Sequence, residues 1–148
     1  MPNLVKVRVT GILIEDSNIL IVRQKVSETR TWSLPGGRLE EEENLDVAIE
    51  RELLEETGLI TKVQKLLYVC EVPDVKPALL HITFLMKRLG GEITLPTNEF
   101  DSNPITDVKM IPIIELIEYG FTEKFMNVVL NDFPGGGNYM GRKINIGL

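Results

Sequence analysis

Apolar stretches separated by short polar segments fill most of the chain. Residues 4–14 (LVKVRVTGILI) alternate apolar and polar side chains at first and then become almost continuously apolar. Residues 15–18 have the composition of a turn, and the apolar run at 19–23 follows directly. This pattern predicts a strand that enters a core and a hairpin that returns beside it. Similar patterns predict strands at 61–72, 79–88, 92–95 and 106–111.

Helical signals appear in three segments. Residues 45–57 contain neither glycine nor proline, with Asn44 before them as a candidate N-cap and Gly58 after them as a C-cap. Residues 113–119 and 122–131 predict two further helices, and Thr122 is a candidate N-cap. The glycine-rich tail, 133–148, shows no clear periodicity. Strands, a helix, more strands and then helices predict an α/β or α+β fold.

The helix predicted at 45–57 has an unusual pattern on one side. At about 100° per residue, Glu52, Glu55 and Glu56 fall in the sector that Leu45, Ala48 and Ile49 occupy one to two turns earlier. Three carboxylates beside a core-facing stripe repel one another unless a divalent cation lies among them. The alternative is an ordinary solvated acidic face, and the spacing alone does not decide between the two.

Further apolar residues cover two sides of this helix. Val47, Leu53 and Leu54 are predicted to lie in the core. Together with the stripe at Ala48 and Ile49, they predict a helix that is packed from more than one direction.

Composition bounds the class of protein. A chain of 148 residues is expected to form a single domain, 1–148, large enough for its own core. The net charge of −6 argues against a general binder of nucleic acid polymers. With one cysteine, Cys70, no disulfide framework is expected. No signal peptide and no apolar run of membrane-spanning length is visible, so we expect no membrane association and a cytoplasmic protein.

Residues 37–59 (GRLEEEENLDVAIERELLEETGL) match a known pattern. With U as a bulky aliphatic residue, the pattern is G-x5-E-x7-R-E-U-x-E-E-x-G-U, and every position is satisfied. The match resembles the Nudix box of the MutT/Nudix hydrolases. The approach to the box, from Ile19 to Val22 and then 32–37 (WSLPGG), is similar to that family as well.

The resemblance implies a specific fold and chemistry. The fold would be an α/β/α sandwich with a mixed β-sheet and the box as a loop-helix-loop. The activity would be hydrolysis of a diphosphate bond in a nucleoside diphosphate linked to another moiety, with Mg²⁺ or Mn²⁺ as cofactor. The metal ligands would be the carbonyl group of Gly37 and the carboxylates of Glu52, Glu55 and Glu56. The same pattern leaves open which carboxylate acts as general base.

Other residues are candidates for the same site. Arg51 lies four residues before Glu55, so an ion pair is expected to orient that carboxylate, which gives Arg51 a supporting role in catalysis. Members of the family often add a downstream carboxylate; the candidates here are Glu99 first and Asp107 second, beside Glu52, for the general base.

Residues outside the box are predicted to bind substrate or to fill the core. Arg23 and Arg30, near the approach to the box, and Asp107 are candidates for substrate binding. His81 is interpreted as a hydrogen-bonded structural histidine and Cys70 as a core thiol, because the chain has no second histidine or cysteine to complete a site.

The substrate is expected to be a small nucleotide. A proline at Pro73, 15 residues after Gly58, is similar to that of ADP-ribose-cleaving members, and a nucleoside triphosphate is an equal alternative. A second hypothesis is a Nudix-like module that binds or senses a nucleotide without hydrolysing it; such modules usually lose box carboxylates. The sequence leaves open whether the chain forms a homodimer.

Overall fold

A computed structural model describes residues 4–97 and 102–148. Its strands, in chain order, are β1 (Val5–Glu15), β2 (Asn18–Arg23), β3 (Trp32–Ser33), β4 (Gly36–Arg38), β5 (Leu59–Val72), β6 (Ala78–Gly91), β7 (Asp107–Pro112) and β8 (Asn138–Arg142). Its helices are α1 (Leu45–Thr57), η1 (Ile113–Tyr119), α2 (Glu123–Leu130) and η2 (Lys143–Ile146), of which η1 and η2 are 3₁₀ helices.

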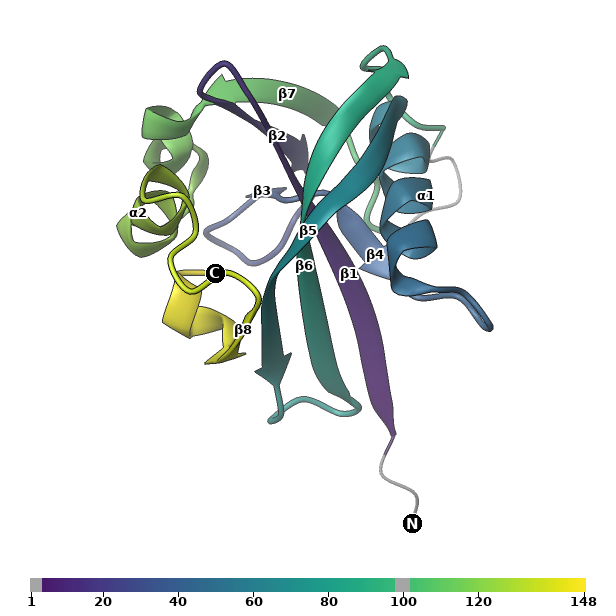
Figure 1. The fold of residues 1–148 in the computed structure, drawn as a ribbon, viewed down its shortest axis with the longest axis vertical. Helices are drawn as coiled ribbons and strands as arrows, with labels where there is room; N and C mark the ends of the chain where they lie inside the picture. Colours follow the sequence, from purple (N-terminus) through teal and green to yellow (C-terminus); the bar gives the residue numbers. More distant parts are fainter. Residues whose placement is uncertain (1–3, 98–101) are drawn as a thin grey trace.

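The strands of the described chain form one mixed sheet. The order β3-β2-β1-β6-β5-β8 is joined by β4, which pairs with β1, and by β7, which pairs with β2. Two of the pairings, β1 with β6 and β5 with β8, are parallel, and the others are antiparallel. Three long strands, β1, β6 and β5, run through the middle of the molecule (Figure 1).

The two faces of the sheet are covered by different helices. Helix α1 lies on one side of the long strands, whereas η1, α2 and η2 lie on the other (Figure 1). The alternation of β1 explains both cores, because successive side chains point to opposite faces. Val9 and Leu13 pack in the core with Ile49 of α1, and Ile12 packs in the core with Phe125 of α2. The predicted arrangement of a mixed sheet between helices is confirmed.

Helix α1 begins and ends where the sequence predicts. Gly58 adopts the left-handed conformation with a φ of 79°, and its N–H donates to the Leu54 carbonyl group. Asn44 occupies the N-cap position, but its side chain makes no capping hydrogen bond. Two predicted core residues of this helix are wrong: Val47 is 50% exposed and Leu54 is 51% exposed. Only one face of α1 contacts the sheet, and these two residues lie on the other face.

Two other predictions differ from the structure. The strand predicted at 92–95 is absent, because β6 extends to Gly91 and residues 92–97 are irregular. The tail, for which the sequence predicted no element, contains β8 and η2. Glycine and the short length of these elements hide them from a periodicity analysis, and β8 is fixed by its pairing with β5.

Candidate active site

Strand β4 brings the glycines of the box against the acidic side of α1. Gly37 pairs with Val9 of β1, which fixes it at the edge of the central strands. A Cβ atom at Gly37 would collide with the carboxylate of Glu52. The absence of a side chain at Gly37 therefore allows the Glu52 carboxylate to lie directly against the backbone of β4.

Glu56 lies one turn further along the same face of α1. Its Oε2 accepts a hydrogen bond of 3.2 Å from the N–H of Gly36, and its carboxyl group shares a hydrogen bond with Glu52. Burial and the adjacent Glu52 charge raise the pKa of Glu56 to about 9, although the Gly36 N–H and the charge of Arg8 act in the opposite direction. Glu56 therefore keeps its proton at neutral pH, where its carboxyl group lies against Glu52.

Arg51 organises the outer carboxylates of the box. Its guanidinium group lies 2.6 Å and 2.9 Å from the two oxygens of Glu43, 3.0 Å from Glu52 Oε1 and 3.2 Å from Glu55 Oε2. It also donates to the carbonyl group of Arg38. The Arg51 hydrogen bonds lower the pKa of Glu43 to about 2. The predicted Arg51–Glu55 ion pair is present, and Arg51 in addition ties the Glu40–Glu43 loop to α1.

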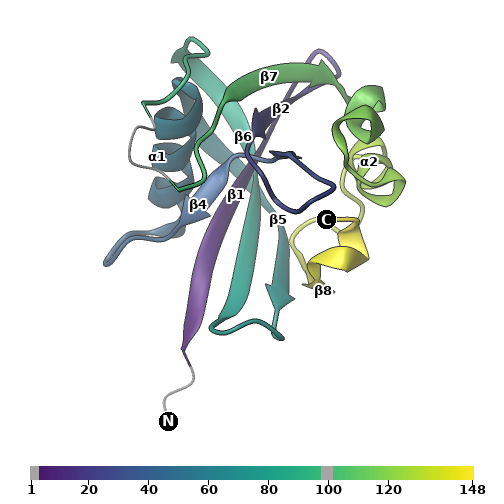
Figure 2. The same ribbon diagram turned by 180° about the vertical axis from the view of Figure 1, so that it is seen from behind.

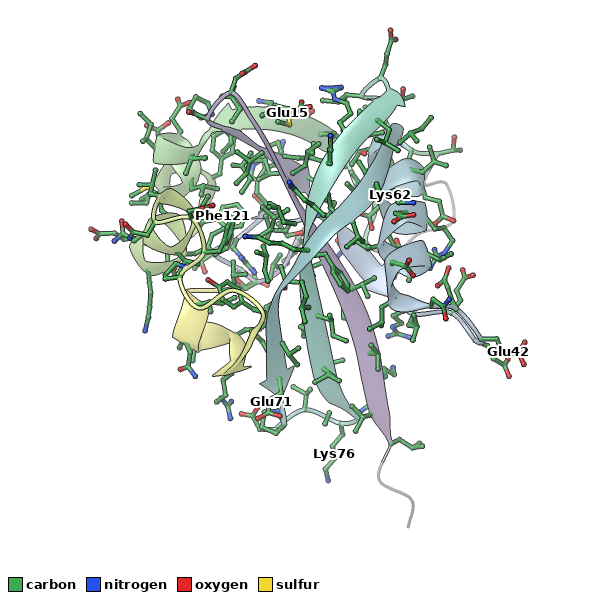
Figure 3. The ribbon with its side chains drawn as sticks, in the orientation of Figure 1. Glu15, Glu42, Lys62, Glu71, Lys76 and Phe121 are labelled. Carbon is green, nitrogen blue, oxygen red and sulfur yellow. The ribbon has the colours of Figure 1, made fainter. Side chains whose placement is uncertain are left out.

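The acid run before α1 is partly buried and partly exposed. Glu43 is nearly buried against Arg51, with 10% of its side chain exposed. Glu42 instead lies at the tip of its loop, pointing away from the molecule (Figure 3).

Glu55 is placed differently from the other two box carboxylates on α1. Its side chain is 59% exposed and contacts Arg51 rather than the Glu52–Glu56 pair. Among residues 4–97 and 102–148, no three acidic, histidine or cysteine side chains are grouped tightly enough to hold a metal ion. The donor set nevertheless fits a hard divalent cation. It consists of oxygens only, and Glu56, whose pKa is raised by burial and by the adjacent Glu52 charge, can release its proton when a cation binds.

A cavity of about 570 Å³ opens on the opposite face of the sheet. Its floor is a row of residues that pair across four neighbouring strands: Arg38 of β4, Arg8 of β1, His81 of β6 and Cys70 of β5. Its walls come from the loop between β2 and β3 and from the C-terminal segment, which lie on the same side of the sheet (Figure 2). Gly36 lines the cavity and also holds Glu56, so the cavity begins where the acidic site ends.

The cavity is basic although the chain is acidic. Five cationic residues line it, and no Asp or Glu of the described residues does; the cations are Arg8, Lys25, Arg30, Arg38 and Lys143. Burial and the neighbouring charges of Arg30 and Arg8 lower the pKa of Lys143 to about 8. Burial likewise lowers the pKa of Arg30, whose guanidinium group lies 5.3 Å from the centre of the Phe121 ring. Figure 3 shows Phe121 between the sheet and the C-terminal helices.

The residues predicted to bind substrate are separated in the structure. Arg30 lines the cavity, whereas Arg23 and Asp107 do not. These two face each other across the β2–β7 pairing, and Asp107 lies 3.9 Å from Lys109. Glu99, the first choice for a downstream carboxylate, lies outside the described residues.

Sequence reasoning missed four of the five cavity cations: Arg8, Lys25, Arg38 and Lys143. The sequence offered one signal for Arg8. Alternation along its predicted strand places Arg8 on the face of the sheet opposite to the one that carries Val7 and Val9. Lys143 lies in the tail, where no pattern marks it. His81 is buried as predicted, but its Nδ1 atom has no hydrogen-bond partner among the described residues, which differs from the predicted hydrogen-bonded histidine.

Comparison with known proteins places this arrangement in a family. The model of the NUDIX domain matches residues 5–136. An ADP-ribose pyrophosphatase of Methanocaldococcus jannaschii is 40% identical over 59% of this chain and 53% of its own length. A MutT-like protein of Streptomyces ambofaciens is 34% identical over 61% of this chain and 56% of its own. The chain thus spans about half the length of these curated relatives.

A solved structure of a Nudix hydrolase has the same fold. The crystal structure of a Nudix hydrolase from Nitrosomonas europaea superposes with a TM-score of 0.71 over 93% of this chain and 79% of the other, at 20% identity. No helix within residues 4–97 and 102–148 is long and apolar enough to cross a membrane. With its complete box, its mixed sheet between helices and a family model that covers most of its length, the chain belongs to the Nudix family.

Proposed function

We propose that the chain hydrolyses a diphosphate bond in a nucleoside diphosphate linked to another moiety, in a reaction that depends on a divalent metal. The observation that carries the proposal is the position of the Glu52–Glu56 pair. These carboxyl groups lie against Gly36 and Gly37, at the edge of a cavity lined by cations. Acids that bind metal and cations that bind phosphate are thus neighbours across one strand.

The proposed metal ligands are the Gly37 carbonyl group and the carboxylates of Glu52, Glu55 and Glu56. Mg²⁺ and Mn²⁺ both prefer such oxygen ligands. A divalent cation held there would offset the charge of the diphosphate and polarise a water molecule for attack on phosphorus. Glu55 reaches this set only if its exposed side chain leaves Arg51, which is a rotation of a surface residue.

The residues of the chain position the acids and the substrate. The Gly36 N–H holds Glu56, and the Arg51 guanidinium group holds Glu52 from its other side. Arg38 lines the cavity from β4, the strand whose Gly36 holds Glu56, and its guanidinium group suits the phosphate oxygens of the diphosphate. Glu52 is our first candidate for the base that accepts the proton of the attacking water, with Glu99 and Asp107 as alternatives.

ADP-ribose is one of two substrate classes that we propose to test first. It is supported by the name of the relative from Methanocaldococcus jannaschii, which is an ADP-ribose pyrophosphatase. Nucleoside triphosphates are the other, because they carry the same diphosphate bond to a nucleoside.

A panel of nucleotides tests the function. We expect phosphate or nucleoside monophosphate release with Mg²⁺ or Mn²⁺ and none with EDTA. Glu55→Gln serves as the inactive control, because it removes a proposed metal ligand. Its side chain is exposed, so the substitution should leave the fold unchanged. A protein that binds nucleotides but releases no product with either metal would be a non-hydrolysing module and would contradict the proposal.

A further inference from the structure

The far wall of the cavity is formed by the C-terminal segment. Lys143, Ile146 and Leu148 line it, and all three lie beyond residue 136, where the match to the family model ends. The remaining walls come from the domain that the family shares. This chain therefore adds its own wall, with its own cation, to the cavity beside the box.

The structure holds this segment in a defined place. The Thr122 hydroxyl group donates a hydrogen bond to the Gly147 carbonyl group and accepts one from the N–H of Phe125 at the start of α2. Gly147 has a φ of 86°, and a Cβ atom there would collide with the backbone nitrogen of Phe125. The N–H of Leu148 donates to the Lys143 carbonyl group. The wall is thus docked on α2 through a contact that requires glycine.

Three cations converge at this end, and among residues 4–97 and 102–148 none of them forms an ion pair. The three are Arg8, Arg30 and Lys143. The charges of Arg30 and Arg8 both act on Lys143, so the three repel one another. An anion bound among them would remove this repulsion and gain charge-assisted hydrogen bonds.

His81 adds a polar atom that needs a partner. Its side chain lines the cavity and is 8% exposed, and its buried Nδ1 makes no hydrogen bond within the described chain. Buried polar atoms are almost always satisfied by protein, water or ligand. Since a neutral imidazole carries one N–H, Nδ1 can donate to an anionic oxygen. Arg8 lies beside His81 in the β1–β6 pairing, so the two side chains can contact the same bound anion.

This point is separated from the acidic site. His81 of β6 lies two gaps between strands from β4, where Gly36 holds Glu56, or roughly 10 Å at ~4.8 Å per gap, and Arg8 of β1 lies one gap away. A diphosphate group held at β4 leaves the cations at the far wall free for a second anionic group. That group must be carried by the remote part of the same substrate.

We propose that Lys143 of the C-terminal segment, with Arg8, Arg30 and His81, binds a phosphate monoester that the substrate carries away from the diphosphate bond. The substrates would then be nucleoside diphosphate derivatives with an additional phosphate ester. A dianionic phosphate suits two guanidinium groups and an ammonium group better than a singly charged carboxylate does. The identity of the ligand as a substrate rests on the proposed function, whereas the phosphate site itself does not.

The single histidine makes the site observable. We would follow the imidazole NMR signals of His81 while inorganic phosphate is added in EDTA, so that neither metal nor turnover contributes. We expect a saturable shift in the wild-type protein. Lys143→Met, which keeps the aliphatic stem, should weaken phosphate binding at least about tenfold, and Lys143→Arg should restore most of it.

A matched variant controls for general charge. Lys87 is exposed on β6 and does not line the cavity, so Lys87→Met removes the same charge elsewhere and should leave phosphate binding unchanged. The His81 signals of each variant before phosphate is added report whether the cavity has kept its structure. No shift with phosphate, or an equal shift in wild type and Lys143→Met, would overturn the proposal.

Three nucleotides then test the ligand class. Calorimetry in EDTA should show adenosine 2′,5′-bisphosphate or 3′,5′-bisphosphate binding at least about tenfold more tightly than 5′-AMP, with the advantage lost in Lys143→Met. Equal binding of all three nucleotides would contradict the assignment to a phosphate ester. If the wild-type protein shows this preference but hydrolyses no nucleotide, the proposed function fails and the phosphate site stands.

Discussion

The two sides of strand β4 differ in charge and in how the chain builds them. On the α1 side, Glu52 and Glu56 share a hydrogen bond, and Arg51 binds the outer acids. On the cavity side, five cationic residues gather without an acidic residue of the described chain among them. The net charge of −6 therefore describes neither side. The proposed hydrolysis of a diphosphate uses both sides of β4, because the acids would hold a metal cation and the cationic residues would hold the phosphates.

The construction of the two sites differs as much as their charge. The acidic site is encoded within residues 37–59, so that a local helix and one turn assemble it. The cavity gathers residues from β1, β4, β6, the loop after β2 and the C-terminal segment. The contiguous site is suited to a reaction common to a family, whereas the dispersed one can change its substrate when a single segment changes.

The largest expected effect comes from the acidic side. Glu56→Gln keeps the size of the side chain and removes a carboxylate from the proposed metal ligands. We expect kcat to fall on the order of 10²–10³-fold, as when one group that stabilises transition-state charge is lost. Glu42→Gln, at the tip of the exposed loop, is the matched control and should retain wild-type turnover. Near wild-type activity of Glu56→Gln at saturating Mg²⁺ would show that the acidic side is not the reaction site.

Adjacent glycines of β4 separate activity from stability. The three atoms nearest to a Cβ at Gly37 all belong to the carboxylate of Glu52, which can swing away. In Gly37→Ala we therefore expect the activity to fall sharply at a nearly unchanged Tm. A Cβ at Gly36 meets the backbone of Val9 and Thr10 in β1, which cannot move. We expect Gly36→Ala to cost about 1–3 kcal/mol of stability, as overpacking does.

Thermal unfolding and steady-state kinetics of both glycine variants measure this difference. The measurement is informative in either direction, because an equal loss of Tm in Gly36→Ala and Gly37→Ala would mean that Glu52 is fixed as rigidly as the backbone.

Particular residues show what the sequence predicts well. The bounds of α1 and its cap at Gly58 follow from local chemistry, and the Arg51–Glu55 pair follows from helix spacing. Local rules could not predict that Glu55 would be more exposed than Glu52 and Glu56, because the sheet edge at β4 decides which carboxylates are covered. The prediction that α1 is packed from more than one direction misplaced Leu54, since a helix on the sheet has only one covered face.

The cavity was the part that the sequence did not reveal. Its residues are far apart along the chain and meet only through strand pairing, and Lys143 owes its place to the contact of Gly147 with Thr122. Such a site depends on tertiary structure, for which neither periodicity nor motif carries a signal. Arg30 was predicted from its proximity to the box, and it is the one substrate-binding candidate that lines the cavity.

On the cavity side, a pH effect on stability is expected from His81. Burial and the charges of Lys143 and Arg8 lower its pKa from 6.5 to about 3. The unfolded chain therefore takes up the proton first as the pH falls. Stability that is complete above pH 6.5 is lost as the pH falls towards 3. Between pH 8 and pH 5 the loss from this one group is about 2 kcal/mol.

Urea unfolding of the wild-type protein and His81→Gln at pH 8 and pH 5, in buffers without phosphate, measures this loss as the difference between them, because the opposite contribution of Glu56 is common to both. His81→Gln should remove most of it while retaining a polar side chain at the cavity floor. If the wild-type protein and His81→Gln lost the same stability between these two values, the imidazole would not be held neutral by the cavity.

The smallest expected effect concerns the contact that docks the C-terminal segment. Thr122→Ala removes the N-cap of α2 and the hydrogen bond to Gly147, and we expect a loss of about 1 kcal/mol, the usual cost of an N-cap. Thr122→Ser keeps the hydroxyl group and should behave as wild type. Because Lys143 belongs to the same segment, Thr122→Ala should also weaken the effect of phosphate on the His81 NMR signals. Turnover of substrates without an additional phosphate should remain unchanged, since the acidic side does not contact this segment. A loss of stability without any change at His81 would mean that the segment keeps its place by β8 alone, and that the cavity side is built more rigidly than its dispersed residues suggest.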